Sequence, residues 1–378
     1  MKKHLALGAV FLAIVGLFLL NGVGAAREWL QPRAYLPLVE NNYDEVPLPA
    51  PVVWKGTQLP GPQGYVTSIA AISNGDLLAL SLTSEGIQLF RSQDEGASWG
   101  VVDDPVLSRE TRAYRLYASP TGPSGQAVFA IGFFGLARSG DGGVSWQHVD
   151  GNLPVGQLVA LAFSPDYESE ATVYALSIST EGTGPYLYIS RDRGQAWQTQ
   201  SDVADMRNSG LMPNDLAAFG PGGLVIATSS GIVRTEDGGA TWQQVAEPFA
   251  ESGGTPAIRA ITRMPSGELL VLSSGQRIPY KSNDGGLTWH WTAAGMDAAC
   301  QYQGGLTIAG APGRLFLAAA GIQGNAPGVF YSPDGDIWRP IPLGLPAGAG
   351  ISTLGALSQD KLLVASADKG LWKVEALP

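Results

Sequence analysis

Short apolar runs recur from residue 53 to residue 378 and are separated by glycine, proline and aspartate. Residues 66–72 and 77–80 are two such runs, joined by Ser73-Asn74-Gly75-Asp76. A third run begins at a glycine, as in 86–90 and 231–233. Apolar runs this short, rich in branched residues and bounded by turn residues, are typical of β-strands. The pattern therefore predicts an all-β chain of consecutive antiparallel strands.

The third run of each unit leads into a phrase of up to nine residues, which we call the Asp turn. Full copies occupy 91–99, 138–146, 234–242 and 281–289, a looser copy occupies 190–197, and a copy one residue short occupies 332–338. The recurring positions are Ser92, Asp94, Gly96 and Trp99; Ser139, Asp141, Gly143 and Trp146; Ser190, Asp192, Gly194 and Trp197; Thr235, Asp237, Gly239 and Trp242; Ser282, Asp284, Gly286 and Trp289; and Ser332, Asp334 and Trp338.

The spacing of the Asp turns indicates the architecture. Their aspartates are separated by 47, 51, 45, 47 and 50 residues. A period near 48 residues favours one four-stranded sheet per unit, as in the blade of a propeller. The last unit has three predicted strands, at 351–354, 361–365 and 370–374, and residues 54–60 resemble the segment that follows an Asp turn elsewhere. We therefore expect a seven-bladed β-propeller of four-stranded antiparallel blades, whose last blade is closed by the N-terminal strand.

Each residue of the Asp turn has a local structural use. Glycine permits the positive φ of a tight turn, and an aspartate carboxylate can accept backbone N–H bonds across it. Tryptophan buries a large apolar face. One carboxylate per turn is too few hard ligands for calcium, and an acid repeated on every blade cannot mark one active site. With one cysteine and three scattered histidines as well, we predict no metal and no cofactor.

The N-terminal region differs in composition from the repeats. Residues 1–26 join a basic start to an apolar run and small residues, which predicts a signal peptide or, if uncleaved, an N-terminal membrane anchor formed by residues 5–26. Residues 27–52 form a proline-rich linker, and 53–378 form the propeller. The expected location is extracytoplasmic, secreted or at the cell surface, with membrane contact only through the N-terminal segment.

Charge narrows the class of partner. The net charge is −10, and it becomes −12 if residues 1–26, which contain Lys2, Lys3 and no acid, are removed. Such a chain has no overall field that would attract nucleic acid. We expect a monomer with a protein or glycan partner outside the cytoplasm.

The Asp turn, written Ser-x-Asp-x-Gly-x-Thr-Trp, resembles the Asp-box or BNR repeat of sialidase-like propellers over about residues 53–378. Families with this repeat include sialidases, xyloglucan-active glycosidases, sortilin-type receptors and photosystem II assembly factors. The resemblance implies that the Asp turns lie at the blade periphery. It also implies that a sialidase would have a Phe/Tyr-Arg-Ile-Pro motif well before the first repeat, whereas Arg277-Ile278-Pro279 lies beside the fifth.

Charged residues at the predicted inner strands are candidates for ligand binding. Inner strands line the central channel, where arginines could face an anionic ligand; alternatively, they pair with neighbouring acids or cover strand ends. A long loop predicted at 199–213 is a second candidate region, because extended propeller loops often carry function. The candidate ligand-binding residues are Arg112, Arg115, Arg259, Arg263, Asp205, Arg207 and Asp215.

Three functions fit these features. The first is an exported, non-catalytic scaffold that binds a protein or glycan, similar to photosystem II assembly factors; the arginines that open three Asp turns (Arg91, Arg138 and Arg234) fit this hypothesis. The second is a sialidase-like or other glycoside hydrolase that acts on extracellular polysaccharide, with catalytic residues unidentified. The third is a structural module of the cell surface.

Overall fold

The structure is a computed structural model, which describes residues 52–377 except for fourteen gaps. The gaps are 108–112, 121–125, 133–134, 150–152, 154–155, 180–184, 204–210, 246–256, 274–278, 293–306, 312–313, 320–327, 343–349 and 367–369. The chain divides into two units, Met1–Val52 and Val53–Pro378. No helix in the described residues has the length and apolar character needed to cross a membrane.

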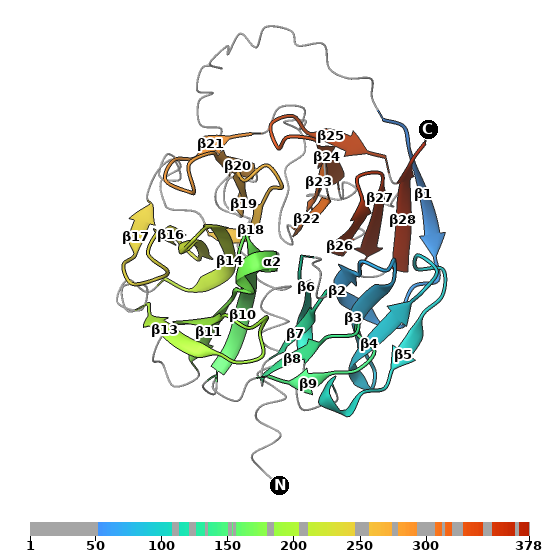
Figure 1. Ribbon diagram of the computed structural model, residues 1–378. Helices are drawn as coiled ribbons and strands as arrows, with labels where there is room; N and C mark the ends of the chain where they lie inside the picture. Colours follow the sequence, from blue (N-terminus) through green and yellow to red (C-terminus); the bar gives the residue numbers. More distant parts are fainter. Residues whose placement is uncertain are drawn as a thin grey trace, which may run out of the picture. The chain divides into compact units, whose positions relative to one another are not determined.

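The described residues form seven four-stranded antiparallel sheets (Figure 1). The first four sheets comprise β2 (Tyr65–Ala71), β3 (Leu77–Thr83), β4 (Gly86–Ser92) and β5 (Gly100–Val102); β6 (Ala113–Ala118), β7 (Val128–Gly132), β8 (Gly135–Ser139) and β9 (Gln147–His148); β10 (Gly156–Phe163), β11 (Val173–Ser179), β12 (Tyr186–Ser190) and β13 (Gln198–Asp202); and β14 (Pro213–Gly220), β15 (Gly223–Thr228), β16 (Gly231–Thr235) and β17 (Gln243–Val245).

The last three sheets comprise β18 (Ile258–Arg263), β19 (Leu269–Ser273), β20 (Pro279–Ser282) and β21 (His290–Trp291); β22 (Thr307–Ala311), β23 (Arg314–Ala319), β24 (Gly328–Ser332) and β25 (Arg339–Ile341); and β26 (Ile351–Ser358), β27 (Lys361–Ser366), β28 (Gly370–Ala376) and β1 (Trp54–Leu59). Two short helical segments complete the described elements, the 3-10 helix η1 (Pro105–Leu107) and the helix α2 (Tyr167–Glu170).

The sheets form the predicted seven-bladed propeller. Neighbouring sheets contact one another in chain order, and the last contacts the first through β26 and β2. The strands that lie innermost in Figure 1 are β2, β6, β10, β14, β18, β22 and β26. Apolar side chains fill the spaces between successive sheets, so each core cluster draws on two blades; Leu78 of β3, for example, packs in one cluster with Leu116 of β6.

The N-terminal strand closes the ring, as the sequence predicts. β1 pairs antiparallel with β28 from Trp54 opposite Ala376 to Leu59 opposite Leu371. Trp54 is buried, and its ring lies 5.2 Å from that of Tyr331 in the preceding sheet. Without β1 the outer edge of β28 would be unpaired, and an open strand edge is a site for aggregation.

A cluster of charges lies across the junction between the last sheet and the first. Glu95 of the first Asp turn accepts hydrogen bonds from Lys361 Nζ at 2.7 Å and Lys373 Nζ at 2.6 Å. Lys373 also pairs with Glu375 at 3.0 Å. These groups are partly exposed, so their contribution to stability is modest.

The Asp turn has the hydrogen bonds expected from its residues. Asp141 accepts bonds from the Ser145 N–H at 2.9 Å and from the Ser139 hydroxyl at 2.7 Å, while Ser139 Oγ accepts from Gly143 N–H at 2.8 Å. Gly142 and Gly143 have φ of 71° and 85°. The aspartate therefore stabilises the turn, and the same pattern recurs at Asp94, Asp192, Asp237 and Asp284.

Each Asp turn also packs against the sheet before it. A Cβ on Gly143 would lie 2.4 Å from a Leu78 methyl carbon, so a side chain here would clash with the previous blade. The arginine at the first position of an Asp turn can also bond to the next Asp turn. Arg138 Nε donates to the Arg193 carbonyl at 2.9 Å, and Arg234 Nε donates to the Gly285 carbonyl at 3.1 Å.

These bonds give the arginines that open the Asp turns a structural role. Arg138 and Arg234 hold the next sheet, and Arg91 Nε donates to Asp76 at 2.9 Å within its own sheet. These contacts serve the fold, so a role of the three arginines in partner binding stays a prediction.

The loop predicted at 199–213 is partly wrong. Residues 199–202 belong to β13 and pair with β12, and Pro213 begins β14. The sequence does not reveal strand β13, because Gln198-Thr199-Gln200-Ser201-Asp202 has no apolar residue to show a strand period.

Deleting Val53–Leu59 should open the ring. Loss of β1 exposes the edge of β28 and removes Trp54 from between the last two sheets, so we expect aggregation or a melting temperature lower by at least about 10 °C. Differential scanning calorimetry measures this change. The control is Lys55→Ala, at an exposed position of β1; equal melting of the deletion variant and the control would contradict closure by β1.

Acidification from about pH 4 to about pH 2 should destabilise the propeller. Burial would raise the pKa of Asp141, but bonds donated by Ser145 and Ser139 lower it from 3.8 to about 2. A carboxyl group with a lowered folded-state pKa stabilises fully above its unfolded pKa, and this is lost as pH falls through the folded value. We expect the melting temperature to drop across this range in calorimetry.

Asp141→Asn provides the comparison for acidification. It removes one of the titrating carboxylates, so it should lower the free energy of unfolding by about 1 kcal/mol at pH 7, given the exposure of the turn. The melting temperature of the variant should also fall less than that of the wild type between pH 4 and pH 2. An identical acid profile for the variant and the wild type would exclude Asp141 as a contributor.

Candidate functional site

A cavity of about 600 Å³ lies among the inner strands. Its lining comes from β2, β6, β10, β14, β18 and β26 and from residues just beyond them. One side carries hydroxyl groups, from Thr67 and Ser68 of the first sheet and Ser352 and Thr353 of the last. Other parts are apolar, with residues such as Leu161, Phe163, Leu216 and Ile261. The cavity thus offers both hydrogen-bonding and apolar surface.

Four predicted site residues line this one cavity: Arg115 of β6, Asp215 of β14, and Arg259 and Arg263 of β18. Three arginines and one described carboxylate therefore line the cavity of a protein whose net charge is −10. Arg112, Asp205 and Arg207 lie outside the described residues. Binding of an anion at the cavity stays a prediction.

Each of six inner strands contains a bulge near its start, which no pattern in the sequence predicts. The extra residues are Thr67, Tyr114, Val159, Asn214, Arg259 and Ser352. A bulge leaves one residue out of the strand ladder and changes the direction of its side chain. Arg259 is itself such a residue, while Arg115 and Asp215 directly follow one, so the bulges help to place three of the four charged residues of the cavity.

The bulges also join neighbouring inner strands. Ser68 Oγ accepts a bond from the Leu116 N–H at 3.0 Å, and Asp215 Oδ2 accepts one from the Ile261 N–H at 3.2 Å. These two contacts occupy equivalent positions in their blades. Asn214 Nδ2 donates to the carbonyl of Ile258 at 2.8 Å. Asp215 is therefore fixed by the next blade as well as by its own.

Arg115 and Asp215 form a pair across the cavity. Arg115 Nη1 lies 3.2 Å from Asp215 Oδ1, and Nη2 lies 3.3 Å from Oδ2, a two-point contact between the second and fourth sheets. The Asp215 side chain is 4% exposed and that of Arg115 is 38% exposed. Burial would lower the pKa of Arg115, but Asp215 raises it, so the guanidinium stays charged and its charge is balanced by Asp215.

The other two arginines differ in their surroundings. Arg259 is exposed, and no ion pair joins it to another described residue. A Cβ on Gly267 would lie 3.6 Å from Arg263 Nη2, which places Arg263 beside the β18–β19 turn. There the pKa of Glu268 is lowered, first by a Ser266 hydrogen bond and to a smaller extent by Lys281 and Arg263. Among the three arginines of the cavity, Arg259 is therefore the one whose positive charge is least balanced by described acidic groups nearby.

The tyrosines of the cavity are poor nucleophiles. Burial raises the pKa of Tyr114 to about 12 and raises that of Tyr117 as well. Tyr114 also donates its hydroxyl proton to the carbonyl of Leu158. Both phenols are therefore protonated at neutral pH, unlike a tyrosine activated for attack.

Glycoside hydrolysis generally needs two carboxyl groups that flank the scissile bond. Among the described residues that line the cavity, Asp215 alone has a carboxylate, and it is already bonded to Arg115 and to the Ile261 N–H. These residues do not assemble the paired acids of a glycosidase.

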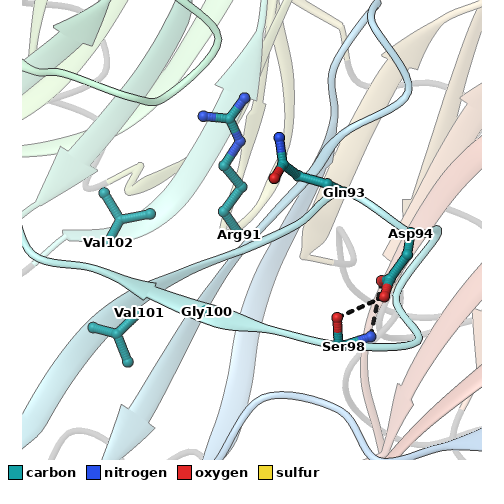
Figure 2. A pocket seen from close by; sticks show the side chains of 7 residues that line it. All are labelled: Arg91, Gln93, Asp94, Ser98, Gly100, Val101 and Val102. Atoms are coloured by element: carbon teal, nitrogen blue, oxygen red, sulfur yellow. Dashed lines mark hydrogen bonds between the residues drawn. The ribbon is translucent and has the colours of Figure 1, made fainter.

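A second, smaller pocket of about 360 Å³ lies beside the first Asp turn (Figure 2). Arg91, Gln93, Asp94 and Ser98 line it together with the strand residues 100–102. Figure 2 shows Asp94 bonded to Ser98, whose N–H and hydroxyl lie 2.8 Å and 2.5 Å from its oxygens. Because Arg91 is engaged with Asp76, the charged groups of this pocket already serve the fold.

Comparison with known proteins gives two kinds of relative. No family model matches the chain. A photosystem II assembly protein, Ycf48, of Synechococcus sp. is 35% identical over 145 residues, which are 37% of each chain. A xyloglucanase of Paenibacillus sp. is 27% identical over 204 residues, 43% of this chain and 19% of the enzyme. The similarity thus spans little more than a third of the Ycf48 sequence.

Solved structures extend the likeness of fold to nearly the whole propeller. A structure of Ycf48 bound to D1 peptide has a TM-score of 0.56 and 18% sequence identity, over 86% of this chain and 97% of that one. The chain is therefore a seven-bladed β-propeller with sequence similarity to both Ycf48 and a xyloglucanase.

Proposed function

We propose that this protein is a non-catalytic assembly scaffold that holds a segment of a partner protein in its central cavity. The segment carries an acidic group near apolar side chains. The observation that carries the proposal is the cavity itself, where three arginines and one buried, paired aspartate lie among apolar and hydroxyl-bearing walls.

The composition of the cavity supports a peptide as the ligand. Phe163 and Pro165, which are partly exposed, offer apolar contacts, and Arg259 offers a charge that is available to a carboxylate. Specific sites combine such apolar lining with a few well-placed polar groups. The similarity to Ycf48, of which one structure contains a D1 peptide, supports a protein partner over a glycan.

The proposal places the protein outside the cytoplasm. Residues 1–26 have the charge and hydropathy of an export signal or anchor, and residues 27–52 have the proline content of a tether. An acidic, disulfide-free propeller suits such a location through its solubility. The partner would then be a protein at or beyond the membrane.

The alternative function is a glycoside hydrolase acting on extracellular polysaccharide. The similarity to a xyloglucanase favours it. The described cavity residues favour the scaffold, since their one carboxylate, that of Asp215, is already bonded to Arg115 and their two tyrosines are protonated. Turnover of xyloglucan, other β-glucans or a fluorogenic sialoside by the purified protein, lost in Arg259→Gln, would replace the scaffold by the enzyme.

Recovery of a partner tests the scaffold directly. The tagged wild type, mixed with detergent-solubilised membranes of its source, should retain one protein in stoichiometric amount. Arg259→Gln should weaken that interaction at least about tenfold, because a charge-assisted hydrogen bond is lost. The control is Arg191→Gln, at an exposed position of the third Asp turn outside the cavity.

Quantitative mass spectrometry of the retained proteins measures the outcome. Equal retention by the wild type and Arg259→Gln would place the partner elsewhere on the propeller. Absence of any enriched protein would favour a structural module of the cell surface.

A further inference from the structure

We propose that Asp215 sets the charge preference of the cavity, so that the site accepts a segment with one negative charge and rejects one with two. This inference rests on the proposed binding function and identifies the class of ligand, an unmodified acidic peptide as opposed to a phosphorylated one. The residue that determines the preference is an acid, although the site itself is cationic.

The pairing of Arg115 removes one of three cations from the reach of a ligand. Both oxygens of Asp215 face both terminal nitrogens of Arg115, at 3.2 Å and 3.3 Å. A two-point contact of this kind holds the guanidinium in one orientation and balances its charge. A ligand that used Arg115 would have to displace a carboxylate that is already fixed in place.

Asp215 is held too firmly to be displaced easily. Its side chain is 4% exposed, and Oδ2 also accepts the N–H of Ile261 in the next blade at 3.2 Å. Moving it would leave that buried N–H without an acceptor, which costs free energy. By contrast, Arg115 is 38% exposed and is available at once if the charge of Asp215 is removed.

Arg259 is then the principal cation for the ligand. It lies at the bulge of β18, is exposed and has no ion-pair partner among the described residues. Arg263 is drawn toward the turn that holds Glu268. A single carboxylate matches this arrangement, whereas a phosphoserine, with a charge of about −1.5 to −2, needs a second cation nearby.

Asp215→Asn tests the inference with little change of shape. The asparagine oxygen can still accept the Ile261 N–H, while its amide group donates and no longer attracts Arg115. The probes are two eight-residue peptides of alanine, leucine and serine, blocked at both ends, with either glutamate or phosphoserine at the same central position. Fluorescence anisotropy at fixed ionic strength gives the dissociation constants.

The wild type should bind the glutamate peptide at least as tightly as the phosphoserine peptide. Asp215→Asn should bind the phosphoserine peptide about tenfold more tightly than the wild type does, because Arg115 becomes available to it. The gain for the glutamate peptide should be smaller. Equal dissociation constants of wild type and Asp215→Asn for the phosphoserine peptide would overturn the inference.

The double variant Arg115→Gln, Asp215→Asn completes the cycle. It removes both charges of the pair, so its preference between the two peptides should match that of the wild type. The double variant also replaces Asp215→Asn as the test if the single variant does not fold. Much weaker glutamate-peptide binding by the double variant would mean that Arg115 contacts the ligand directly, against the inference. The recovery experiment with Arg259→Gln judges the binding function separately.

Discussion

The structure depends on one constraint: each of its sheets has two apolar faces, and both must be covered. Each four-stranded sheet here covers the next, and the cores shared by neighbouring sheets show that no blade is complete by itself. In an open row of such sheets, the first and the last sheet would each expose an apolar face. Closing the row into a ring covers both faces. Pairing of β1 with β28 is therefore the contact on which the other blades depend, since it completes the last sheet and holds it beside the first.

The contacts between blades follow two layers. At the Asp turns, cations such as Arg138 and Arg234 hold carbonyl groups of the next turn, and glycines such as Gly143 allow the turn to pack against the previous sheet. At the inner strands, the bulges supply side chains such as Ser68 and Asp215 that accept backbone N–H groups of the next blade. The cavity thus lies inside a wall that is joined by hydrogen bonds, which is suitable for holding charged side chains in fixed positions.

Local patterns were enough to predict the blades. The period of the Asp turns, the three strands after Ile351 and the match of Trp54 to other turn tryptophans together indicate seven sheets and their closure. The inner-strand arginines could also be selected, because a charge beside an apolar run is unusual. The pairing of Arg115 could not be predicted: Arg115 and Asp215 are 100 residues apart, and both follow bulges that have no residue signature in Tyr114 or Asn214. Polar strands such as β13 were missed for a related reason, since periodicity is visible only where apolar residues alternate.

Closure by the two ends of the propeller has a consequence for the order in which the protein is made. β1 is synthesised first, yet its partner β28 emerges only after more than three hundred further residues. Until then the first sheets lack a closed ring, and the edge that β1 will occupy does not exist. Contacts between segments so distant in sequence form slowly, and incomplete sheets expose unpaired edges. Until its last strand is made, the nascent propeller therefore carries unpaired strand edges through which it can aggregate.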